Sequence, residues 1–360
     1  MSMPTARNCA CIAVAMGGSH SMHHFVEVDA GGQPDRSILA NPQARSLAQQ
    51  LEGTTLLAWL KSKKQVASGL LGIEIGPEGI ALAHVQRSPG QPVQLRNCLF
   101  RPGTPEQQPE LLKSLVAELG LAGMPVNFVL HPALDQLLLL DCPDVPADEL
   151  RDALRWRIKE LISEPLEQVV VDAFALPEDA YRGRSRMAYC AVLAKSHVAT
   201  WAALLKHAGL QLQSIDVTEM AFRNIGLQAG ADGLNLGLLR LRSSEGLICI
   251  QQGADLYMAR RIEQGLDRVD QGFTGVTLEI QRSLDYFESQ LGKGYINRLL
   301  LLPMKRDGAA VLAALSAGLA VNLQALDLRE LFVGQAAAEL DEQQQAYCLA
   351  AVGAALRQEA

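Results

Sequence analysis

The spacing of hydrophobic and polar residues alternates between two periods from Leu70 onward. Residues 70–76 and 79–85 follow a period of two, which is typical of strands, and the Pro77–Glu78 pair between them predicts a tight turn. Residues 235–262 contain three further strand-like runs, separated by the turns SSEG and QQGA. Two hairpin groups of the same kind predict a duplicated α/β architecture, in which each half begins with an antiparallel hairpin.

Apolar residues at helical spacing predict helices between these strands. In the helix expected to begin at Pro146, the apolar stripe consists of Leu150, Leu154, Ile158, Leu161 and Ile162. The helix expected over 274–292 has a predicted buried face of Leu278, Ile280, Leu284 and Phe287. Further helices are predicted over 109–120, 196–209, 308–321 and 346–358, and further strands over 126–132, 136–143, 167–176, 186–195, 210–217, 296–303 and 320–328.

This order of elements predicts the domain boundaries. The first half is expected over 70–230 and the second over 231–360. Within the first half, the helix at Pro146 and the strands and helix that follow it predict an inserted small α+β subdomain over about 143–215.

The first 69 residues differ in composition from the rest. Residues 1–55 are rich in Ser, Gly, Gln, His and Met and show no sustained period, so we expect a disordered extension. Met16 and Met22 leave open whether this segment belongs to the mature chain. Residues 56–69 contain LLAWLKSKKQ, which we interpret as a linker with a short basic helix, with contact to a membrane surface as the alternative.

Charge and cysteine content exclude several classes of protein. The net charge of −7 and the isoelectric point near 5.6 argue against a nucleic-acid-binding face, because phosphate contacts require clustered Lys and Arg. The seven cysteines are scattered without Cys-x-x-Cys spacing, which favours reduced thiols over a disulfide framework or a metal site. No run approaches the ~18 uninterrupted apolar residues that span a bilayer, so we expect a cytoplasmic protein.

Five segments together resemble the PilM family of actin-like pilus assembly proteins, and most closely its branch in MSHA-type pili, the MshI proteins. The most distinctive are the Pro-initiated stretch VPADELRDALRWRIKELISEPLEQVVVDAFAL and the helix LEIQRSLDYFESQ; the others are GIEIGPEGIALAHV, AALSAGLAVNLQALDL and LAAVGAALR. The resemblance covers about 70–358 and does not extend to residues 1–55.

This resemblance implies an actin-like (ribonuclease H-like) ATPase fold with an inserted small subdomain. It also implies a scaffold of a type IV, MSHA-type pilus assembly platform, cytoplasmic and peripheral to the inner membrane. The implied partner is a PilN-like, here MshJ-like, inner-membrane protein whose cytoplasmic tail docks on this chain. We expect that tail in the groove between the inserted subdomain and the surrounding sheet; the contact residues and any self-association stay open.

The motifs that hold nucleotide in such folds are altered here. The first hairpin has Glu74 in place of the usual Asp and keeps Gly76, but Pro77 removes one N–H donor and Glu78 adds a negative charge where phosphate would lie. The second hairpin carries Arg240 and Arg242 instead of an acid. The adenosine loop is replaced by LLPMKRDG, in which bulky side chains precede the only glycine.

Two residues of the helix over 274–292 complete the candidate nucleotide site. By resemblance to actin-like chaperone ATPases, Glu279 would lie against the ribose hydroxyls and Arg282 would stack on the base. The alternative is that both form surface pairs on an amphipathic helix. The sequence thus predicts a degenerate nucleotide site of Glu74, Gly76, Glu279 and Arg282, with no catalytic residue and no metal ligand. ATP with Mg²⁺ is the one cofactor left open.

Rival functions have less support. An active ATPase of the same superfold needs an acid in both hairpins and a base near the γ-phosphate. A component of a general secretion platform would carry a transmembrane segment. No P-loop, dinucleotide fingerprint, nucleophile elbow or His-Glu-x-x-His motif is present in the sequence. Asp141 and Asp144 flank Pro143 in what we interpret as a turn, and His131 before Pro132 as a strand end.

Overall fold

The structure is a computed structural model that describes residues 68–358 except 182, 184–185, 232 and 269–272. The predictions for the extension over 1–55 and for the linker, apart from its last two residues, lie outside the described residues. Within the described ranges, no helix is both long and apolar enough to cross a membrane.

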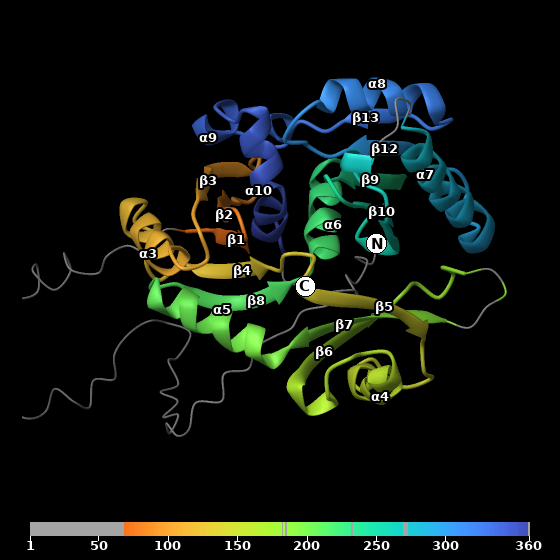
Figure 1. Cartoon of the computed structure of the whole chain (residues 1–360), viewed down its shortest axis with the longest axis horizontal. Coiled ribbons are helices and arrows are strands. Elements are labelled where there is room, and N and C mark those ends of the chain that lie inside the picture. The colour runs from red at the N-terminus through yellow and green to blue at the C-terminus, as the bar shows by residue number, and fades with distance from the viewer. Residues whose placement is uncertain (1–67, 182, 184–185, 232, 269–272, 359–360) are drawn as a thin grey trace, which may run out of the picture. The chain divides into compact units, whose positions relative to one another are not determined.

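The first half is built on a five-stranded sheet in the order β3-β2-β1-β4-β8 (Figure 1). Its strands β1, β2 and β3 are antiparallel neighbours, whereas β1, β4 and β8 run parallel. The bounds are β1 Leu70–Gly76, β2 Gly79–Gln86, β3 Gln94–Pro102, β4 Pro125–Val129 and β8 Gln211–Asp216. The predicted hairpin therefore forms, and its first strand lies in the centre of the sheet.

The second half repeats this arrangement in the order β11-β10-β9-β12-β13. Here too the first three strands are antiparallel, and β9, β12 and β13 are parallel. The bounds are β9 Asn235–Leu241, β10 Gly246–Gln252, β11 Asp255–Ile262, β12 Arg298–Leu301 and β13 Leu323–Ala325. The predicted duplication is confirmed, because the two sheets share strand order and direction.

A third, three-stranded sheet of order β5-β7-β6 forms the inserted part. Its strands are β5 Asp135–Asp141, β6 Val169–Ala175 and β7 Met187–Ala194, and helix α4, Leu150–Arg157, packs on one face through a buried cluster. These bounds differ from the predicted 143–215. Strand β5 belongs to the small sheet, while β8 joins the first sheet, because its parallel pairing with β4 completes that sheet.

Helices cover these sheets (Figure 1). Besides α4 they are α3 Gln108–Glu118, α5 Lys195–His207, α6 Thr218–Gln228, α7 Thr274–Tyr286, α8 Gly308–Gly318, α9 Gln335–Ala338 and α10 Glu342–Ala355. Helix α7 continues as a π-helical turn over Phe287–Leu291.

Three details correct the sequence predictions. Helix α4 begins at Leu150, not at Pro146, because 146–149 close a separate turn in which the Glu149 N–H donates to the Pro146 carbonyl. Leu161 of the predicted stripe is 53% exposed, because the α-helix has already given way to a short 3₁₀ turn. Leu278 is 49% exposed, because it lies on the opposite side of α7 from Ile280 and Leu284.

Helix α10 is buried on almost every side between the first sheet and α6. Two glycines permit this close packing: a Cβ on Gly72 would lie 1.8 Å from the Ala351 carbonyl oxygen, and one on Gly353 would lie 2.3 Å from that of Ala221. The C-terminal helix thereby fixes β1, whose end carries the candidate site.

Candidate functional site

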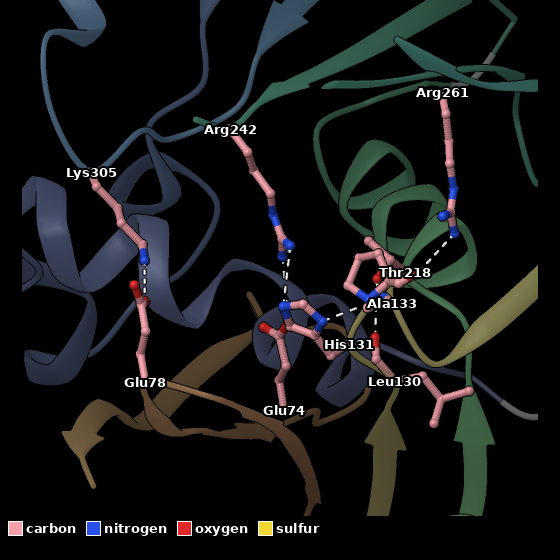
Figure 2. A network of polar contacts seen from close by, with 10 residues as sticks. Glu74, Glu78, Leu130, His131, Ala133, Thr218, Arg242, Arg261 and Lys305 are labelled. Carbon is pink, nitrogen blue, oxygen red and sulfur yellow. Dashed lines mark hydrogen bonds and ion pairs between the residues drawn. The ribbon is translucent and has the colours of Figure 1, made fainter. Parts of the chain in front are cut away.

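The candidate site lies where the end of β1 meets loops of the second half (Figure 2). Glu74, near the end of β1, pairs with Ala81 and Val129 on the neighbouring strands and is only 7% exposed. Burial raises the pKa of its carboxyl group, and the positive charges of Arg240 and Arg242 partly offset this effect.

Gly76 ends β1 and leaves room for the residues around it. Its carbonyl oxygen accepts a hydrogen bond of 2.8 Å from Nε2 of Gln108 on α3. A Cβ at this position would lie 3.4 Å from Cδ2 of His131. The two hairpin residues predicted from the sequence thus lie together, and beside them is the loop that follows β4.

Arg242 reaches from the second half into this site, as Figure 2 shows. Its Nη2 lies 3.8 Å from Oε1 of Glu74, and its Nη1 lies 3.3 Å from Nε2 of His131. Burial and the arginine's charge lower the pKa of His131. A neutral imidazole accepts a hydrogen bond through Nε2, so the guanidinium connects the hairpin acid to the loop after β4.

Lys305 makes a second connection between the halves (Figure 2). Its ammonium group forms an ion pair with the carboxylate of Glu78 and lies 4.1 Å from the ring centre of Tyr347 on α10. That ring stacks on Phe100 of β3, with 4.0 Å between ring centres. The loop that replaces the adenosine motif is therefore attached to the first half. We call Glu74, Glu78, His131, Arg242 and Lys305 the bridging network.

The other two predicted nucleotide residues lie on α7, away from β1 (Figure 1). Oε2 of Glu279 accepts a hydrogen bond of 3.1 Å from the backbone N–H of Glu263, and Arg282 is exposed. The structure brings Glu74 and Gly76 together but leaves Glu279 and Arg282 outside the bridging network.

Sequence reasoning missed the contacts that surround this network. Arg261 of β11 donates to the Pro132 carbonyl oxygen at 3.0 Å, and the Ala259 N–H donates to the Tyr189 hydroxyl at 2.8 Å. Both contacts join the second half to the first half or to its small sheet. The acids Asp135 and Glu219 are also buried here. An arginine or a tyrosine in a strand carries no signal of which distant backbone group it will contact.

Comparisons with known proteins identify the fold. No protein-family model and no curated protein matches the chain in sequence. Among solved structures, the PilM–PilN type IV pilus biogenesis complex matches with a TM-score of 0.61 and 22% identity, covering 80% of this chain and 98% of that chain. The architecture is therefore that of an actin-like ATPase fold, as the sequence predicted.

Two other structures match less well. The cytoplasmic domain of EpsL, an inner-membrane component of the type II secretion system of Vibrio cholerae, gives a TM-score of 0.42 at 14% identity, covering 65% of this chain and 82% of that chain. A Bacteroides thetaiotaomicron protein described as having an actin-like ATPase fold gives a TM-score of 0.44 at 12% identity, covering 74% of this chain and 92% of that chain.

Proposed function

We propose that this protein is a cytoplasmic scaffold of a type IV pilus assembly platform of the MSHA type, an MshI-like member of the PilM group. It binds the cytoplasmic tail of a PilN-like, MshJ-like inner-membrane protein and is held at the membrane by that tail. The observation that carries the proposal is the match to the PilM–PilN complex, which covers 98% of that chain.

The bridging network supports a scaffold rather than an ATPase. Mg²⁺ is bound through carboxylate, phosphate and water oxygens, but here the Arg242 guanidinium lies beside Glu74, the acid at the end of β1. The Lys305 ammonium is already paired with Glu78. Because these cations are held by the protein's own acids and Pro77 lacks an N–H, the residues present do not fit Mg·ATP. ATP hydrolysis is not part of the proposed function.

The small sheet offers the surface on which a tail would dock. Strand β5 is an edge strand of its sheet in the described part of the chain, and so is β8 in the first sheet. Leu138 and Leu140 pack toward α4, so Leu137 and Leu139 alternate to the other face, where they are half-buried. An extended tail that pairs with the edge of β5 would place apolar side chains against Leu137 and Leu139.

Membrane fractionation tests the proposal. The full chain should pellet with inner membranes from cells that contain the PilN-like protein and stay in the supernatant when that partner is deleted. The matched control is a partner that lacks only its cytoplasmic tail, which should also leave the protein in the supernatant. Equal amounts in the pellet with and without the partner would contradict the proposal.

A further inference from the structure

Strand β5, whose edge is the proposed docking surface, is held at its start by the second half of the molecule. The loop over 130–134 connects β4 to β5. Nη2 of Arg261, on β11, donates to the Pro132 carbonyl oxygen of this loop at 3.0 Å, as Figure 2 shows from the side of the arginine. Nη1 of Arg242 lies 3.3 Å from Nε2 of His131 in the same loop. Two arginines of the second half therefore fix the chain just before β5.

A second connection runs through the middle of the small sheet. Leu139 of β5 and Tyr189 of β7 are direct cross-strand partners, so their side chains lie next to each other on the face turned away from α4. The Tyr189 ring is buried, with 5.5 Å between its centre and that of Phe174. Its hydroxyl accepts a hydrogen bond of 2.8 Å from the backbone N–H of Ala259 on β11. The leucine that the tail would contact is thus one side chain away from the second half.

Both connections end on the same strand. In the described part of the chain, β11 is an edge strand of the second sheet, and Ala259 and Arg261 are two residues apart on it. A backbone N–H at a sheet edge needs an acceptor from outside the sheet, and at Ala259 the Tyr189 hydroxyl is that acceptor. The position of β5 and the contacts of β11 therefore depend on each other.

We infer that Tyr189 and Arg261 are positioning residues for the partner's tail, and that docking of the tail on β5 is coupled to the contact between the small sheet and β11. This inference rests on the proposed function. A tail that orders β5 through Leu139 also orders Tyr189 beside it, and so strengthens the hydrogen bond to Ala259. By thermodynamic linkage, loss of the contact with β11 weakens tail binding by the same factor by which the tail strengthens that contact.

Hydrogen exchange of the full chain, with and without a saturating synthetic peptide of the PilN-like protein's cytoplasmic tail, tests the coupling. In the parent, the tail should slow exchange in β5 and also slow exchange of the Ala259 amide about fivefold or more. Tyr189→Phe removes the hydroxyl and keeps the ring. This variant should keep the protection of β5 and lose the effect at Ala259, whereas a role of Tyr189 in packing alone predicts no change.

Fluorescence anisotropy with the labelled tail peptide measures the second consequence. Tyr189→Phe and Arg261→Gln should each weaken tail binding about fivefold or more. Arg261→Lys keeps a charged donor for the Pro132 carbonyl oxygen and should restore part of the affinity. The matched control is Arg260→Gln, an exposed neighbour on β11, which should bind as the parent does. If Tyr189→Phe does not fold, the arginine variants still decide.

The outcomes separate this inference from the proposed function. Parental affinity in Arg261→Gln, or protection of β5 without any change at Ala259, would overturn the inference while the proposed function stands. No binding of the tail by the parent would overturn both.

Discussion

At the scale of single residues, Asp135 is a buried acid whose carboxylate oxygens are left unsatisfied by the described part of the chain. It begins β5, is 6% exposed, and neither of its carboxylate oxygens has a hydrogen-bond partner among the described residues. Burial and the nearby Glu219 raise its pKa to about 8, against about 3.9 for an unfolded chain. The folded protein therefore holds a proton here that the unfolded chain has released.

This predicts a pH effect on stability. Because the pKa of Asp135 is raised in the folded state, its stabilising contribution to the free energy of unfolding is complete below pH ~4 and is lost as the pH rises toward 8. Asp135→Asn should remove this loss, so the variant should gain about 1 to 3 kcal/mol over the parent between pH 5 and pH 9. Urea unfolding at pH 5, 7 and 9 measures it. The exposed Asp148→Asn is the control, and parallel pH curves for Asp135→Asn and the parent would contradict the assignment.

The sequence predicted part of the candidate site at this scale. Glu74 and Gly76 were found because a hairpin places them at a strand end, which is a local pattern. Arg242, which contacts Glu74, and Lys305, which pairs with Glu78, lie far away in the sequence, and nothing local indicates which cation meets which acid. Their contacts depend on how the two halves meet, which only the structure reveals.

At the scale of elements, most strands and helices were predicted, and the misses have physical reasons. Strand β3 carries polar residues throughout and pairs with β2 through a bulge, so its period of two is broken. Helix α6 buries Glu219, Arg223 and Asn224, so it lacks the polar face that marks an amphipathic helix. Tertiary contacts, not local pattern, decide both elements.

The small sheet should depend on α4 for its core. Leu154 is fully buried in the cluster between this helix and the sheet. Leu154→Ala should destabilise the protein by about 2 to 5 kcal/mol, because it leaves a cavity that the sheet cannot refill. Hydrogen exchange should locate the loss in β5, β6 and β7, with the two large sheets still protected. Uniform loss of protection would instead show that the three sheets unfold as one unit.

If the tail docks on β5, substitutions at two leucines should differ in their effect on tail binding. Leu139 lies on the face turned away from α4, while Leu161 is exposed near the end of that helix. Leu139→Arg should weaken binding of the partner's tail about tenfold or more, because it places a charge in an apolar contact. Leu161→Arg should bind as the parent does. Fluorescence anisotropy with a labelled tail peptide measures both, and equal affinities would exclude this surface.

At the scale of the whole molecule, two similar hairpins in the sequence predicted the duplicated halves. No pattern in the sequence predicted the contacts that join these halves. In the bridging network, Arg242 contacts Glu74 and Lys305 pairs with Glu78, and under the proposed function these contacts leave no place for nucleotide. Calorimetric titration with Mg·ATP should therefore give no heat at millimolar concentrations. Arg282→Ala should behave identically, since Arg282 is exposed and outside the network. Micromolar binding, or a turnover abolished by Glu74→Gln, would favour an active ATPase.

The proposed function of this chain is to hold a membrane partner's cytoplasmic tail. The most direct measurement is a calorimetric titration of the full chain with a synthetic peptide of the PilN-like protein's cytoplasmic tail, with and without Mg·ATP. The peptide should bind one-to-one at micromolar concentrations, and Mg·ATP should leave its affinity unchanged. No binding at millimolar peptide, or binding that appears only with Mg·ATP, would contradict a nucleotide-independent scaffold.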